Sequence, residues 1–123
     1  MQTKHGITTP GRKLYDALRD SLSNDYRDGL YTERLRICSQ IARAAKTYHR
    51  RQEEACSYEW ACGDKWDRDE ARLEKRIAAL VAELGEGFGV VLEGDPRGAC
   101  VFITTPDKRT DDWGQRGICA LQD

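Results

Sequence analysis

Apolar side chains recur every third or fourth residue in three successive segments of this chain, a spacing that predicts amphipathic helices. In the first segment Leu14, Leu18 and Leu22 stand four residues apart. They predict a helix over about 12–26, which ends at an Asp-Gly turn signal. The residues before it are polar, show no periodicity and end in Thr-Thr-Pro, so residues 1–10 are expected to form a flexible arm.

The second segment predicts the longest helix. Residues 33–60 contain neither glycine nor proline. Thr32 can cap the N-terminus of this helix, and Glu33 suits the positive end of its dipole. The alanines between 42 and 45 predict the close approach of a neighbouring helix. One broad arc is expected to be buried, and it carries Leu35, Cys38, Ile41, Ala42, Ala45, Tyr48, Gln52 and Cys56.

The third segment predicts a helix over about 67–84. Asp67 and Glu70 form a start that resembles a capping box. Gly85 follows the last apolar position, where a residue with a left-handed backbone is expected. A short glycine-containing link joins the two long helices, which are therefore expected to pack as an antiparallel hairpin.

Beyond residue 87 the period of the hydrophobic pattern shortens to two, which is typical of strands. Strands are predicted over 88–93, 99–105 and 113–121, with the sequence Gly-Asp-Pro-Arg-Gly at 94–98 forming a tight turn between the first two. The expected fold class is α+β in the order ααα-βββ, with the helix hairpin packed on a three-stranded antiparallel sheet.

The composition limits the classes of protein that fit. A chain of 123 residues predicts one domain, over 11–123. Charged residues make up 33% of it but the net charge is −1, which argues against a general binder of polyanions. No apolar run reaches the roughly 20 residues of a membrane span, and the N-terminal sequence lacks a signal-peptide pattern. A cytoplasmic protein without a membrane anchor is expected.

The five cysteines are an odd number, which does not suggest a complete disulfide framework. Cys56 and Cys62 follow His49 at spacings that match no common zinc motif, so a metal or thiol site there is only a distant alternative. No cofactor or metal is expected. The remaining cysteines are interpreted as small buried side chains, and they are Cys38, Cys100 and Cys119.

The charge pattern of the long helix is the strongest functional signal. Between residues 34 and 51 the chain has six cations and no acid. Arg36, Arg43 and Arg50 are seven residues apart and share one face, with Lys46 close by. Two interpretations stay open. The face is either solvated and neutralised by acids of neighbouring helices, or it contacts an acidic protein surface or a phosphate backbone.

An acid-rich stretch follows at 53–70. It is interpreted as a solvated, helix-capping cluster, and a surface that mimics the charge of a nucleic acid is the alternative.

The turn at 94–98, the alternating strand after it and the later Asp112-Trp113-Gly114 resemble a family of small, mostly uncharacterised phage and prophage proteins. The resemblance covers about 33–121. It implies a phage accessory protein, of a kind that acts by occupying a surface of a host protein, including those of defence complexes.

Three further side chains are candidate contacts with a partner. Arg97 stands at the tip of the turn, where no backbone requirement calls for arginine, so it either contacts a partner or pairs with a nearby acid. Trp60 and Trp66 flank the link between the long helices, where burial competes with a role as interface anchors.

Catalysis is not expected, because the sequence contains no P-loop, GxSxG, HExxH or dinucleotide motif and only two histidines. The functional hypothesis is a non-enzymatic phage protein that binds and inhibits a bacterial host complex, such as a CRISPR–Cas system. It would act as a monomer or homodimer through the residues named above. A nucleic-acid-binding or regulatory module that uses the basic face of the long helix is the alternative.

Overall fold

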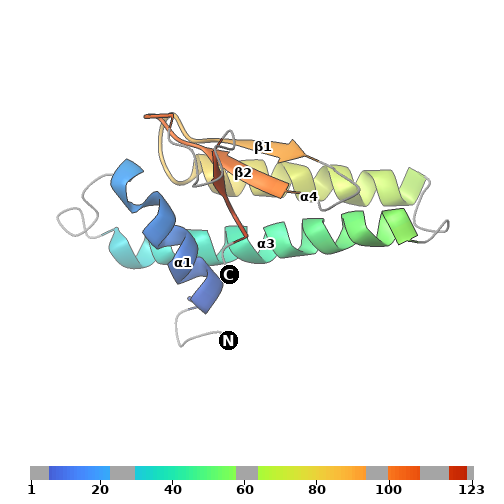
Figure 1. Cartoon of the computed structure of the whole chain (residues 1–123), viewed down its shortest axis with the longest axis horizontal. Coiled ribbons are helices and arrows are strands. Elements are labelled where there is room, and N and C mark those ends of the chain that lie inside the picture. Colours follow the sequence, from blue (N-terminus) through green and yellow to red (C-terminus); the bar gives the residue numbers. More distant parts are fainter. Residues whose placement is uncertain (1–5, 23–29, 58–63, 94–99, 109–116, 122–123) are drawn as a thin grey trace.

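A computed structural model of the chain describes residues 6–22, 30–57, 64–93, 100–108 and 117–121. Its elements, in chain order, are α1 (Thr9–Leu18), the short 3-10 helix η1 (Arg19–Ser21), α3 (Tyr31–Ser57), α4 (Asp64–Ala82), β1 (Gly89–Glu93), β2 (Cys100–Thr104) and β3 (Ile118–Cys119). The predicted α+β class and the order of three helices followed by three antiparallel strands are confirmed. Helices α3 and α4 lie side by side, α1 crosses α3, and the sheet lies over the same half of the hairpin (Figure 1).

The first helix begins nearer the N-terminus than the pattern of leucines predicts. Thr8 caps it, because its Oγ1 accepts a hydrogen bond from the backbone N–H of Gly11 at 3.1 Å. Pro10 lies in the first turn, where its missing N–H costs nothing. Ile7 is buried in the core, so residues 7–10 belong to the packed part of the chain and not to an arm. The α-helix ends at Leu18, well before the predicted residue 26.

Helices α1 and α3 approach closely at Gly11 and Ser39. A Cβ atom on Gly11 would lie 2.0 Å from the Oγ of Ser39 and 2.5 Å from its Cα, so only glycine fits. The Ser39 hydroxyl donates to the carbonyl of Leu35 at 2.8 Å and accepts from the N–H of Thr8 at 2.9 Å. The buried alanines of α3 confirm the close approach of a neighbouring helix that the sequence predicts.

Two arginines of α3 hold the hairpin together at its two ends. Arg34 donates from Nη1 to the carbonyl of Glu83, just beyond α4, at 2.7 Å. Arg51 donates from Nη2 to the carbonyl of Trp66, in the first turn of α4, at 3.1 Å. The helices are therefore antiparallel, as predicted. The shared core includes Ile41 of α3 and Ile77 of α4, both fully buried.

Two predicted boundaries of the long helices are wrong by a few residues. Helix α3 begins at Tyr31, so Thr32 lies inside its first turn instead of capping it. Helix α4 begins at Asp64, so Asp67 and Glu70, the predicted capping box, lie inside the helix. Gly85, the third residue beyond α4, has a positive φ of 145°, which glycine adopts readily.

The sheet places one apolar face against the helices. Strand β1 pairs antiparallel with β2, with Val90 opposite Ile103, and β2 pairs antiparallel with β3, with Ile103 opposite Ile118. Val101, Ile103 and Ile118 belong to the same buried core as the helices. In the described part of the third predicted strand, 117–121, β3 spans two residues, and 113–116 lie outside the described residues. None of the helices in the described ranges combines the length and apolar character that crossing a membrane requires.

Candidate functional site

The four cations predicted to share one face of the long helix do so in the structure. Arg36, Arg43, Lys46 and Arg50 are all exposed on α3. The opposite side of the helix is buried, with Cys38 and Ala45 among its fully buried residues. Arg36 and Arg50 are 14 residues apart, which corresponds to about 21 Å along a helix axis. The cations therefore form a row on a rigid, well-packed element.

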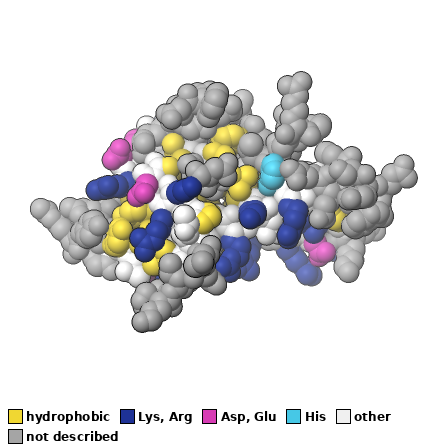
Figure 2. Space-filling view, turned by 60° about the horizontal axis from the view of Figure 1, so that its bottom comes forward, with side chains coloured by type: hydrophobic (Ala, Val, Ile, Leu, Met, Phe, Trp, Pro, Cys, Tyr) yellow, Lys and Arg dark blue, Asp and Glu magenta, His cyan; other side chains and the backbone are white. Residues whose placement is uncertain are grey.

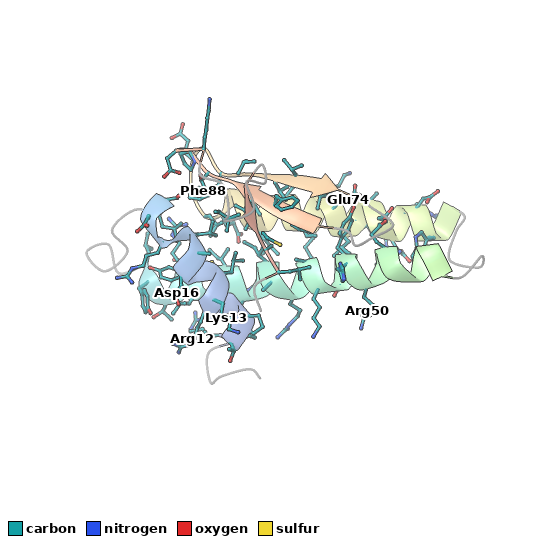
Figure 3. The ribbon with its side chains drawn as sticks, viewed as in Figure 1. Arg12, Lys13, Asp16, Arg50, Glu74 and Phe88 are labelled. Atoms are coloured by element: carbon teal, nitrogen blue, oxygen red, sulfur yellow. The ribbon has the colours of Figure 1, made fainter. Side chains whose placement is uncertain are left out.

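Helix α1 extends this row with two cations that the sequence interpretation did not single out. Arg12 and Lys13 are exposed and point, like Arg50, toward the lower side of the molecule in Figure 3. Figure 2 shows Lys and Arg side chains on this side with hydrophobic side chains between them and fewer acids. One exposed acid of α1, Asp16, lies near Arg12 and Lys13 (Figure 3). We call the six residues Arg12, Lys13, Arg36, Arg43, Lys46 and Arg50 the basic face. Only the docking of α1 across α3 brings Arg12 and Lys13 to it, which no local sequence signal could reveal.

The exposed side chains of α3 within 31–52 are all polar. Within 31–52 the exposed side chains are Thr32, Glu33, Arg36, Gln40, Arg43, Lys46 and Arg50. Glu33 is the one acid among them, and it lies in the first turn, where the helix dipole favours it. No aromatic or aliphatic side chain interrupts this surface.

Trp66, a predicted contact with a partner, lies in the first turn of α4, at the end of the hairpin where α3 ends. Its side chain is half-buried, and the guanidinium carbon of Arg51 lies 4.0 Å from the centre of its ring. A cation this close to an indole face is attracted by the ring. Together with the bond from Arg51 to the Trp66 carbonyl, this contact joins α3 to α4 and occupies one face of the ring.

A cluster of polar side chains accompanies this contact. The Gln52 amide donates to the Glu70 carboxylate across the two helices. Burial raises the pKa of Glu70, as do Glu74 and Asp67, while Arg51 opposes the increase. Burial, followed by the nearby Glu74 and Glu70, likewise raises the pKa of the Tyr48 phenol. Glu70 is therefore part of the helix interface, unlike the fully solvated cluster that the sequence suggested.

Neutralising Glu70 should stabilise the protein at neutral pH. Because the pKa of Glu70 is higher in the folded chain, the free energy of unfolding falls as the pH rises from the ordinary glutamate value toward that raised value. Glu70→Gln keeps an acceptor for Gln52 and should raise the free energy of unfolding at pH 7, by less than about 1 kcal/mol because the group is half-exposed. The substitution should also make the free energy of unfolding depend less on pH over this range. Urea unfolding from pH 4 to 7 measures both.

Glu86→Gln makes the same charge change at an exposed turn and serves as the control. Equal effects of the two substitutions would show that Glu70 has no special environment.

Three of the other residues that the sequence singles out have described side chains, and the rest do not. Cys38 is fully buried as predicted, and Cys119 is half-buried with its thiol 3.7 Å from the carbonyl of Leu121. His49 is half-buried on α3. The rest lie outside the described residues or side chains, and these are Cys56, Trp60, Cys62, Arg97 and Cys100. Among the described residues, no group of three or more His, Cys, Asp or Glu is placed to hold a metal ion.

Comparisons with known proteins give no match to this chain, whether with family models, with curated proteins or with solved structures.

Proposed function

We propose that this chain is a non-enzymatic binding protein that docks an anionic partner on the basic face, and that this partner is part of a bacterial host complex inhibited by the binding. The observation that carries the proposal is the exposed cation row on α3, which α1 extends. Exposed cations that share one face create a local positive potential, which speeds encounters with an anionic surface.

The net charge of −1 does not describe this face. Acids and cations alternate along α4, and Glu70 is drawn into the interface between the helices. On α3, in contrast, Arg43, Lys46 and Arg50 follow one another at spacings of three and four residues, at which like charges repel by a few tenths of a kcal/mol per pair. An anionic partner would relieve that repulsion.

The resemblance to phage accessory proteins makes a bacterial host complex the first partner to test, and a defence complex such as CRISPR–Cas the first among these. Inhibition by surface occupation needs only a stable fold and a complementary surface.

Two variants with the same change in net charge test the proposal. In the first, Arg43, Lys46 and Arg50 on the basic face are replaced by glutamate. In the second, the same replacement is made at Arg72, Lys75 and Arg76, which are exposed on α4. Immobilised wild type and the α4 variant should retain one stoichiometric complex from bacterial lysate, and the basic-face variant should lose it. Equal retention by all three proteins, or by none, would contradict the proposal.

Inhibition is tested in cells. Bacteria with an active defence system should be infected more readily by a sensitive phage when they express the wild type or the α4 variant. The basic-face variant should give no such increase. An unchanged plating efficiency with the wild type, in hosts whose complex it captures, would leave binding without inhibition and contradict that part of the proposal.

A further inference from the structure

We infer that the anionic group on the basic face is the phosphate backbone of a nucleic acid, contacted without reading the base sequence. This inference rests on the proposed function and names the chemistry of the partner at the same surface. Three features of the described residues lead to it, namely the polar exposed side chains of α3 within 31–52, the spacing of the cations and the position of α1.

The first feature is that α3 exposes no aromatic anchor within 31–52. Protein interfaces concentrate their binding energy in a few desolvated anchors, above all tryptophan, tyrosine and arginine, and their centres are depleted in lysine. The exposed residues within 31–52 offer only cations, Gln40 and two residues of the first turn, so arginine is the one such anchor among them. Contacts with phosphate use arginine, lysine and neutral polar side chains and need no apolar anchor. Trp66 does not supply one on this row, since its ring packs against Arg51 between the helices.

The second feature is the linear arrangement of the charges. Arg36, Arg43 and Arg50 recur every seven residues, about 10.5 Å apart along the helix axis. One strand of duplex DNA places a phosphate about every 3.4 Å along its axis. The row of about 21 Å spans the rise of about six base pairs, which is more than half a helical turn, so each strand winds away from the row and only some of its phosphates lie within reach. Ser39, which lies between Arg36 and Arg43 on this face, is covered by Gly11 of α1, so a phosphate backbone on this side would contact cations of both helices.

The third feature explains why base readout is not expected. Recognition helices insert into the major groove, which is about 12 Å wide and accepts one helix of about 10–12 Å diameter. Helix α1 packs against α3 at Ser39, within the span of the cation row. Arg12 and Lys13 of α1 point to the same side as Arg50 (Figure 3). Two adjacent helices are too wide for the groove, so the basic face contacts the backbone from outside.

Fluorescence anisotropy with labelled 20-mers of mixed sequence tests the inference. The probes are duplex DNA, duplex RNA, single-stranded RNA and a poly-glutamate peptide, each titrated with the full chain between 50 and 200 mM NaCl. We expect binding to the nucleic acids with little dependence on sequence. With about four phosphate contacts, affinity for duplex DNA should fall about 100-fold over this salt range. In Arg43→Gln/Lys46→Gln/Arg50→Gln, the slope of log K against log salt should become shallower by about 3.

The outcomes separate this inference from the proposed function. Binding to poly-glutamate that the glutamine variant loses, with no binding to any nucleic acid, would overturn the inference and keep the proposed anionic partner. Absence of binding to all four probes at 50 mM salt would contradict both. Strong dependence on base sequence would overturn the claim of backbone contact alone. Nucleic-acid binding with an unchanged salt slope in the glutamine variant would place the site away from the basic face.

Discussion

Leu14→Ala is expected to lower the free energy of unfolding by about 3 kcal/mol. Leu14 is fully buried in the core where α1 packs on α3, and truncating it leaves a cavity that the neighbouring helices fill only in part. A domain of this size is stabilised by about 5–15 kcal/mol, so the loss is a large share of the total. Urea unfolding followed by circular dichroism measures it.

Asp16→Ala, an exposed change on the same helix, is the control and should shift stability by no more than about 0.5 kcal/mol. A similarly small effect of Leu14→Ala would mean that α1 is not packed on the core, and Arg12 and Lys13 would then not be held beside the cations of α3.

Gly11→Ala should destabilise the protein by about 2 kcal/mol, against the usual preference for alanine in helices. Alanine at an ordinary helical position is about 1 kcal/mol more favourable than glycine. Here the new methyl group would lie 2.0 Å from the Ser39 hydroxyl and 2.5 Å from the Ser39 Cα, so the helices must separate. That separation also stretches the hydrogen bond from the Thr8 N–H to Ser39.

Lys13→Gly supplies the comparison for Gly11→Ala, because it measures the ordinary cost of glycine at an exposed site of the same helix, about 1 kcal/mol. Both exchanges should lower the melting temperature although they run in opposite directions. A rise in melting temperature for Gly11→Ala would show that α1 and α3 are not in close contact.

The hydrophobic pattern alone predicts most of the architecture, because burial follows from the periodicity. The buried arc of α3 includes Leu35, Ile41 and Tyr48 as the helical spacing indicates. The change to a period of two after residue 87 marks the start of the sheet. These features depend only on which residues are apolar and on the interval between them, and both can be taken from the sequence.

Helix ends depend on single side chains whose alternatives look alike in the sequence. Thr8, Thr32 and Asp67 are all residues that favour helix caps, yet of the three only Thr8, which the sequence placed in an arm, caps a helix. The Thr-Pro pair at residues 9–10 is compatible both with the end of an extended arm and with the first turn of a helix. The helical alternative is fixed by the burial of Ile7 and by the hydrogen bond from the Thr8 N–H to Ser39, 31 residues further along the chain.

The candidate site was predictable only where it lies on one element. Arg36, Arg43, Lys46 and Arg50 share a face because helical geometry places them there. Arg12 and Lys13 join them through tertiary packing. Trp66 has a local contact with Arg51 that the sequence does not reveal, since the pairing depends on the register of two antiparallel helices.

The most direct test of the account is one affinity ratio, measured with duplex DNA at 50 mM NaCl for the two glutamate variants. Both carry the same change in net charge, so the ratio reports only where the charges lie. If DNA binds on the basic face, the variant at Arg43, Lys46 and Arg50 should bind at least tenfold more weakly than the variant at Arg72, Lys75 and Arg76. Equal affinities would contradict it, because binding would then follow the overall charge of the chain and not the basic face.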